Sequence, residues 1–159
     1  MLAKKHFQQG VTLVESMIAL LVISIGLLGI ASLQITAMSQ NASSLNHSQA
    51  VWYAYNMSDR IRANKGVFAN YDGIDTSNTY SQDCLSSACT NAQMLTADAA
   101  DWSTMTGNLP GGRGIITSPT ADGLTVSVMW DDEGTGATGT NCGTDPNVDL
   151  TCYRLVVAP

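Results

Sequence analysis

Apolar residues dominate one long stretch near the start of the chain, from Met17 to Leu33. No Asp, Glu, Lys or Arg occurs between Ser16 and Ser58, so the stretch carries no charge. About 20 consecutive apolar residues in a helix are enough to cross a bilayer. The pattern therefore predicts a membrane-spanning helix over residues 11–33.

The residues ahead of this stretch indicate its orientation. Lys4 and Lys5 lie in the nine-residue segment Met1–Gln9, and basic residues favour the cytoplasmic side of a membrane. We therefore expect a cytoplasmic N-terminus and a periplasmic remainder. Glu15 lies where the apolar stretch begins, and a carboxylate at that depth is costly unless it has a partner. A secretory signal peptide and a plain membrane anchor are the alternatives, and neither gives a reason for Glu15.

A second apolar pattern continues beyond the stretch. Residues at intervals of three and four would share one face of the same helix: Met38, Ala42, Leu45, Gln49, Trp52 and Tyr55. We expect this amphipathic half, residues 34–65, to lie with that face against a globular head. Arg60, Arg62 and Lys65 suit the last turn of a helix, and Gly66 is expected as its left-handed C-cap.

Residues 66–159 are predicted to form the head. Asn, Asp, Ser and Thr are frequent in residues 66–91, which predicts a loop. A short helix is expected from Asn91 to Thr106, with Trp102 in the core. Alternating apolar residues then predict antiparallel strands at 114–117, 124–130 and 151–158. The expected fold class is α+β, with a long N-terminal helix packed on a small antiparallel β-sheet head.

The segment Gly10-Val11-Thr12-Leu13-Val14-Glu15-Ser16, between a short basic stub and an apolar helix, resembles the class III signal of type IV pilins and pseudopilins. The resemblance implies that residues 1–10 are a leader, which prepilin peptidase removes by cutting between Gly10 and Val11. It also implies N-methylation at Val11. Glu15 would be the assembly glutamate, which neutralises the amine of Val11 on a neighbouring subunit, since a buried carboxylate needs a partner. Val11 departs from the Phe usual at its position.

Three head motifs narrow the resemblance to the PilV family of minor pilins: Asp59-Arg60-Ile61-Arg62-Ala63-Asn64, Asp101-Trp102 followed by Leu109-Pro110-Gly111-Gly112, and Val128-Met129-Trp130. It implies a pilin-like fold and a minor type IV pilin that primes or caps pilus assembly with other minor pilins and the major pilin. A tip adhesin is a further implied partner. The protein would lie in the bacterial inner membrane, in contact with lipid, and then on the pilus at the cell surface, with a role in adhesion or twitching. The alternatives are a type II secretion pseudopilin and a membrane-anchored periplasmic binding domain.

Charge and cysteine content limit the partners further. Removing Lys4 and Lys5 with the leader lowers the basic residues from seven to five against thirteen acidic ones, a net charge of −8. Nucleic acid is not an expected partner, because its binding rests on Lys and Arg. The four cysteines follow the apolar stretch, which suits an oxidising compartment. Three connectivities are possible, and we expect the local pairs Cys84–Cys89 and Cys142–Cys152.

The loop from Asp131 to Asp149 is acidic and rich in glycine. Its segment Gly134–Gly139 has the form G-x-G-x-x-G, but no helix follows it to bind a pyrophosphate. The carboxylates lack the spacing of an EF-hand, and we expect neither a metal nor a cofactor. C-terminal disulfide loops of pilins bear surface contacts, so the resemblance implies a partner contact at Asp131, Asp132 and Glu133. No catalytic set is apparent, and no enzyme is expected.

Overall fold

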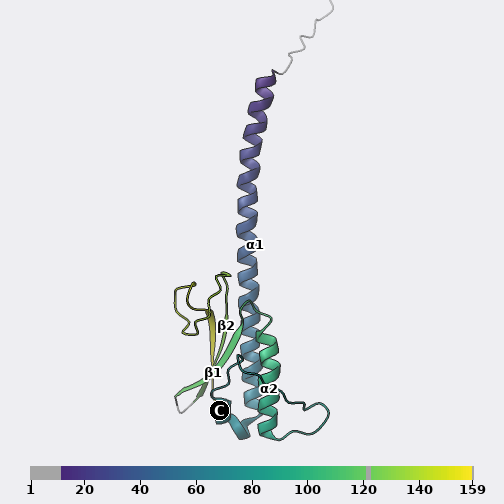
Figure 1. Cartoon of the computed structure of the whole chain (residues 1–159), viewed down its shortest axis with the longest axis vertical. Coiled ribbons are helices and arrows are strands. Elements are labelled where there is room, and N and C mark those ends of the chain that lie inside the picture. Colours follow the sequence, from purple (N-terminus) through teal and green to yellow (C-terminus); the bar gives the residue numbers. More distant parts are fainter. Residues whose placement is uncertain (1–11, 121–122, 159) are drawn as a thin grey trace, which may run out of the picture. The chain divides into compact units, whose positions relative to one another are not determined.

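The computed structural model describes residues 12–120 and 123–158, which form helices followed by an antiparallel sheet (Figure 1). In chain order the elements are α1 (Leu13–Ala63), the 3-10 helix η1 (Lys65–Tyr71), α2 (Asn91–Thr106), β1 (Arg113–Thr120), β2 (Gly123–Trp130) and β3 (Thr151–Val157). The predicted α+β fold is thereby confirmed. The chain divides into two compact units, Met1–Ala42 and Ser43–Pro159, and the second unit is the globular head.

The described part of the first unit is the N-terminal half of α1. Its large apolar side chains are exposed on every side of the helix, including Leu13 at 77% and Leu28 at 72%. A helix that is apolar all round requires an apolar environment. Within residues 12–120 and 123–158, α1 is the one helix long and apolar enough to cross a membrane, judged by length and composition.

The head is built on one face of the C-terminal part of α1. The buried residues on this face are Ala50, Tyr53, Ala54, Met57, Ser58 and Ile61. The face expected from the sequence was wrong, because Leu45, Trp52 and Tyr55 are 58%, 59% and 48% exposed. Both faces carry apolar residues, so periodicity alone did not separate them. On the buried face the indole Nε1 of Trp102 donates a hydrogen bond to the backbone carbonyl of Tyr53 at 3.2 Å.

The sheet has the strand order β1-β2-β3, and both pairs are antiparallel. The central strand β2 buries the alternating set that its sequence predicts: Leu124, Val126, Val128 and Trp130. These side chains join the core formed by α1, α2 and η1. Met129 points to the other face of the sheet and is also buried, because Ala137 and Leu150 of the following loop cover it.

Helix α2 has the predicted bounds and a well-defined start. Thr90 is its N-cap, and a capping box joins Thr90 to Gln93 in both directions. Trp102, near its end, is fully buried, as expected. The ring of Trp102 lies against Gly114 of β1, where an added Cβ would come within 2.6 Å of the indole. Trp102 of α2 therefore contacts both α1 and the sheet.

The end of α1 differs from the sequence prediction. Gly66 has no left-handed φ, and the chain continues as η1 instead of stopping at a glycine C-cap. The prediction of a loop over residues 66–91 was therefore wrong for residues 66–71, which belong to η1. A Cβ at Gly66 would come within 2.5 Å of the side chain of Asn91. The glycine thus provides space where α2 begins, and Tyr71 is buried in the core.

Candidate functional site

Glu15 lies in the first turn of α1, and Thr12 caps that turn. The Thr12 hydroxyl accepts a hydrogen bond from the backbone N–H of Glu15 (3.3 Å), and the Thr12 carbonyl accepts one from Ser16 (3.2 Å). A carboxylate near a helix N-terminus is stabilised by the helix dipole. The Glu15 side chain is exposed, and among residues 12–120 and 123–158 it forms no ion pair. Its charge is therefore available to another molecule.

Thr12 was missed by the sequence reasoning, although a signal for it exists. Thr12 and Glu15 form the pattern T-x-x-E ahead of an apolar run, which is typical of a helix N-terminus. The hydroxyl of Thr12 fixes where α1 begins and thus places Glu15 in its first turn. The expected cleavage site, Gly10 and Val11, lies outside the described residues.

The apolar half of α1 presents an uncovered surface that suits helix packing. Gly26 and Gly29 lie one turn apart, and an added Cβ at either would meet nothing within 4 Å. Small residues on a membrane helix allow the backbone of a second helix to approach closely. This surface can therefore be covered either by lipid or by similar helices.

The head also exposes apolar side chains on α1. Leu45, Trp52 and Tyr55 lie on the face turned away from the head core, and we refer to these three residues as the outer stripe. Their spacing of seven and three keeps them on one side of the helix. Burial and then the neighbouring phenol of Tyr55 raise the pKa of Tyr153 on β3. The head thus leaves more than half of Leu45 and Trp52, and about half of Tyr55, exposed on this face.

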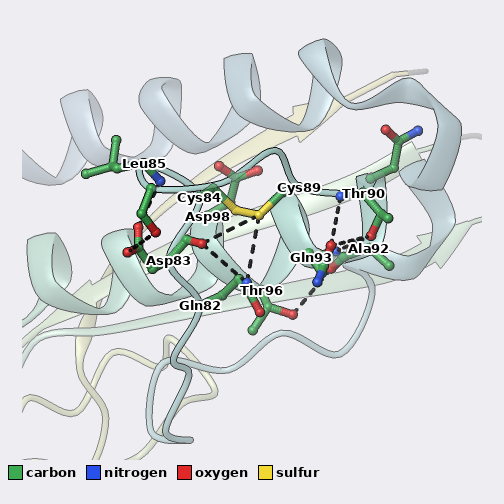
Figure 2. The surroundings of a disulfide bond; sticks show 12 residues. Gln82, Asp83, Cys84, Leu85, Cys89, Thr90, Ala92, Gln93, Thr96 and Asp98 are labelled. Atoms are coloured by element: carbon green, nitrogen blue, oxygen red, sulfur yellow. Dashed lines mark hydrogen bonds between the residues drawn. A yellow bond between two sulfur atoms is a disulfide. The ribbon is translucent and has the colours of Figure 1, made fainter.

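The Cys84–Cys89 disulfide closes a short loop ahead of α2 (Figure 2). The Asp83 carboxylate accepts hydrogen bonds from the backbone of Leu85 (2.8 Å) and the hydroxyl of Ser86 (2.8 Å). These bonds, the one from Leu85 above all, hold the pKa of Asp83 below its usual value. The Leu85 side chain is fully exposed at the tip of the loop. The loop is therefore held in one conformation by a covalent bond and a carboxylate.

The Cys142–Cys152 disulfide fastens the acidic loop to β3. Asp131 accepts hydrogen bonds from the backbone of Gly136 (2.8 Å) and Thr135 (3.1 Å), which lower its pKa. Asp132 accepts bonds from the indole of Trp130 (2.8 Å) and the hydroxyl of Ser43 (2.5 Å). Of the three residues expected to contact a partner, two thus bond within the head, and Glu133 is the one in the exposed class.

A network of charged and polar groups joins α1, η1 and α2 inside the head. The Arg60 guanidinium binds the carboxylates of Asp98 and Asp101 at 3.0 Å each. Burial lowers the pKa of Arg60, but its hydrogen bonds to both carboxylates outweigh burial and leave the pKa raised. Tyr71 donates to Asp98 at 2.6 Å, and its pKa is raised by burial and then by this bond.

The sequence pattern predicted Arg60 as a helix C-terminal charge and gave no sign of this network. Asp98 is 5% exposed, and a buried carboxylate is costly unless it is paired and hydrogen-bonded. Arg60 and Tyr71 satisfy its two oxygens, and the Asn64 amide in turn donates to Tyr71 at 3.1 Å. The network is therefore a structural connection between helices far apart in the sequence.

The histidine and cysteine side chains of the described residues are engaged in contacts within the head. Within residues 12–120 and 123–158, no group of three His, Cys, Asp or Glu side chains could hold a metal ion. His47 packs edge-on against Trp130 and Tyr153, at ring-centroid distances of 5.9 and 6.0 Å. The cysteines at 84, 89, 142 and 152 are all in disulfides.

Two family models match the chain. Residues 32–100 match the model described as type IV pilin Tt1218, and residues 5–31 match the prokaryotic N-terminal methylation motif. No curated protein and no solved structure matches it. The methylation motif overlaps the apolar start of α1 with Glu15, and the pilin model covers the rest of α1, η1 and the first half of α2. The two matches support a pilin-type structural subunit.

Proposed function

We propose that this chain is a minor type IV pilin. It is cut between Gly10 and Val11, methylated at Val11, and held in the inner membrane by residues 11–33 until it is assembled. The observation that carries the proposal is the methylation motif at residues 5–31, which coincides with an apolar helix that the rest of the chain leaves exposed. The match of residues 32–100 to a pilin model supports it.

Assembly moves the apolar half of α1 from lipid into a bundle of similar helices. A carboxylate in that bundle is costly unless it is paired, and Glu15 pairs with the amine of Val11 on a neighbouring subunit. The cap at Thr12 supports this role, because it holds Glu15 in the first turn of α1, where the carboxylate faces outward from a regular helix. One charge pair then sets the register between subunits.

The head contributes two surfaces to the proposed assembly. The outer stripe of Leu45, Trp52 and Tyr55 lies on α1, the same helix that carries the apolar surface, and it packs against neighbouring pilin subunits. The acidic loop meets another minor pilin or a tip adhesin, with exposed Glu133 as its first contact. Replacing residues 131–133 with Ala and finding capture of other pilins unchanged would count against the second contact.

The proposal also includes a position near the pilus tip. There, as in the PilV family, the chain primes assembly with other minor pilins or presents an adhesin. Its support is the set of head motifs around Arg60, Trp102 and Trp130. Trp102 and Trp130 are core residues, and Arg60 joins α1 to α2. These motifs support the proposal through the architecture of the head.

Mass spectrometry of the N-terminal peptide tests the proposal directly. Protein is taken in parallel from sheared surface filaments and from membranes. A peptide that starts at methylated Val11 in the filaments is the expected result. Processed protein confined to membranes would instead indicate a type II secretion pseudopilin or a priming complex that stays in the membrane. An N-terminus at Met1 in both fractions would indicate a plain membrane-anchored binding domain and overturn the proposal.

The role of Glu15 is tested by Glu15→Val, with Ser24→Val as the matched control. Both variants introduce Val into α1, and the side-chain bond found for Ser24 within residues 12–120 and 123–158 is to the carbonyl of Leu20 in its own helix. Both should be processed normally. We expect Glu15→Val to be lost from sheared filaments and Ser24→Val to be incorporated. Equal incorporation of both would refute the charge pair.

A further inference from the structure

The face of the sheet turned away from α1 holds a groove that the proposed assembly does not use. Its volume is about 510 Å³. The groove spans all three strands and also touches the acidic loop; the lining residues are Ile115, Thr117, Thr125, Ser127, Met129, Thr140, Arg154 and Val156. This size lies within the range of roughly 300–1,000 Å³ that ligand sites occupy.

One side of the groove is a fixed wall. Thr140 belongs to the acidic loop, which the Cys142–Cys152 disulfide fastens to β3. Beside Thr140 the backbone of Gly139 bonds to that of Val148 (2.8 Å) and Leu150 (2.9 Å). A covalent bond and a local backbone ladder therefore hold the wall in place before any ligand arrives. A preformed site avoids part of the ordering cost of binding.

Arg154 gives the groove a positive charge that has no direct ion-pair partner among the described residues. The guanidiniums of Arg60, Arg62 and Arg113 each pair with a carboxylate. Within residues 12–120 and 123–158, Arg154 has no carboxylate within 4.0 Å, and the one bond found for it is to the carbonyl of Asn141 at 3.4 Å. A guanidinium presents five donors in a fork that fits a carboxylate.

The other lining residues indicate what accompanies that carboxylate. Thr117, Thr125, Ser127 and Thr140 offer hydroxyls that both donate and accept hydrogen bonds. Ile115, Met129 and Val156 add apolar surface, and Val156 is 68% exposed. An extended peptide supplies backbone donors and acceptors together with apolar side chains. A sugar acid would leave the apolar side chains without a counterpart, and a small free acid would fill little of the groove.

We propose that this groove binds an extended acidic segment of a partner protein, in which Asp or Glu alternates with apolar residues. Arg154 pairs with a carboxylate of the segment, the hydroxyls bond to its backbone, and its apolar side chains cover Ile115 and Val156. All residues that line the groove belong to the head, so this binding does not depend on whether the chain is a pilin.

Nuclear magnetic resonance titration of the full chain in detergent micelles tests the proposal. The probes are the peptide acetyl-Val-Glu-Val-Glu-Val-amide, its Gln counterpart, and an oligomer of galacturonic acid. Arg154→Gln removes the charge, and Arg62→Gln is the matched control on another exposed surface of the head. Val156→Glu places an internal carboxylate two residues from Arg154 on the same face of β3, where it competes with the probe.

The acidic peptide is expected to shift the amides of Thr125 and Ser127. Its binding should weaken roughly tenfold in Arg154→Gln, as expected for loss of a charge-assisted pair, and remain unchanged in Arg62→Gln. Val156→Glu should also bind it more weakly, while circular dichroism shows an unchanged fold. Equal binding of the Gln peptide, no change in Arg154→Gln, or no shift at the groove would overturn the proposal. If the galacturonate oligomer bound and the peptide did not, the groove would be a glycan site and the proposed peptide site would be wrong.

Discussion

Gly114→Ala should destabilise the head by forcing apart β1 and the ring of Trp102. The new Cβ would lie 2.6–2.8 Å from three atoms of the six-membered ring, Cη2, Cζ3 and Cζ2. Trp102 is fully buried, and its Nε1 donates to the Tyr53 carbonyl, so the ring cannot move without breaking that bond. Gly114 has no left-handed φ, and the obstacle is therefore space rather than backbone strain.

The expected cost follows from three contributions. Overpacking of a core costs about 1–3 kcal/mol. Weakening the hydrogen bond from Trp102 to Tyr53 adds roughly 1 kcal/mol. The reduced freedom of the unfolded chain on replacing glycine offsets about 0.4–1 kcal/mol. We therefore expect the free energy of unfolding to fall by about 2 kcal/mol.

A double-mutant cycle with Trp102→Phe isolates the steric term. Phenylalanine lacks the ring atoms that meet the new Cβ, so Gly114→Ala should cost about 1–2 kcal/mol less in the Trp102→Phe background. Urea unfolding of the full chain in micelles, followed by near-ultraviolet circular dichroism, gives the four free energies. Additive effects, or an unchanged stability in Gly114→Ala alone, would refute this packing argument.

The two neighbouring aromatic residues of α1 should separate stability from assembly. Tyr53→Ala removes a side chain that is 6% exposed, and it should lower the free energy of unfolding in urea by about 3 kcal/mol. Trp52→Ala should change that free energy by less than about 0.5 kcal/mol. It should nevertheless lower the subunit's share of sheared filaments on immunoblots. Normal incorporation of Trp52→Ala would exclude the outer stripe from assembly. The hydrogen bonds of Arg113 hold the pKa of Asp75 below its usual value. The pair should therefore stabilise the head above about pH 4, the pKa of Asp75 in the unfolded chain. This stabilisation should be lost as the pH falls through the lower pKa of Asp75 in the folded head. Arg113→Ala should therefore cost about 1 kcal/mol at pH 7, allowing for partial solvent exposure, and progressively less in acid; a constant difference across an unfolding series from pH 7 to pH 2 would contradict this.

Local patterns determined much of the fold. The uncharged apolar stretch predicted the exposed half of α1, because membrane insertion depends on composition over one continuous segment. Thr90 as N-cap and Gly107 as C-cap mark the start and the end of α2 at the predicted residues. Strict alternation predicted the buried set of β2. In each case the information lies within a few residues of the element it specifies.

The sequence also placed Glu15 at the start of the apolar helix, and the structure adds the cap from Thr12 that holds it in the first turn. The T-x-x-E pattern could have revealed that cap. The cleavage between Gly10 and Val11 stays a prediction, because those residues lie outside the described range. A local motif was thus enough to predict Glu15 as a candidate assembly residue. Its partner in another subunit does not follow from that motif.

Contacts between distant segments decided the rest. Periodicity placed apolar residues on two faces of α1, and only packing against Trp102 and the sheet selected the face of Tyr53 over that of Trp52. Arg60 looked like a helix-terminal charge until α2 brought Asp98 to it. The groove beside Arg154 exists because the strands and the disulfide-fastened loop meet there. A one-dimensional pattern specifies which residues share a face, but the face that is covered depends on the energy of packing against segments remote in the chain.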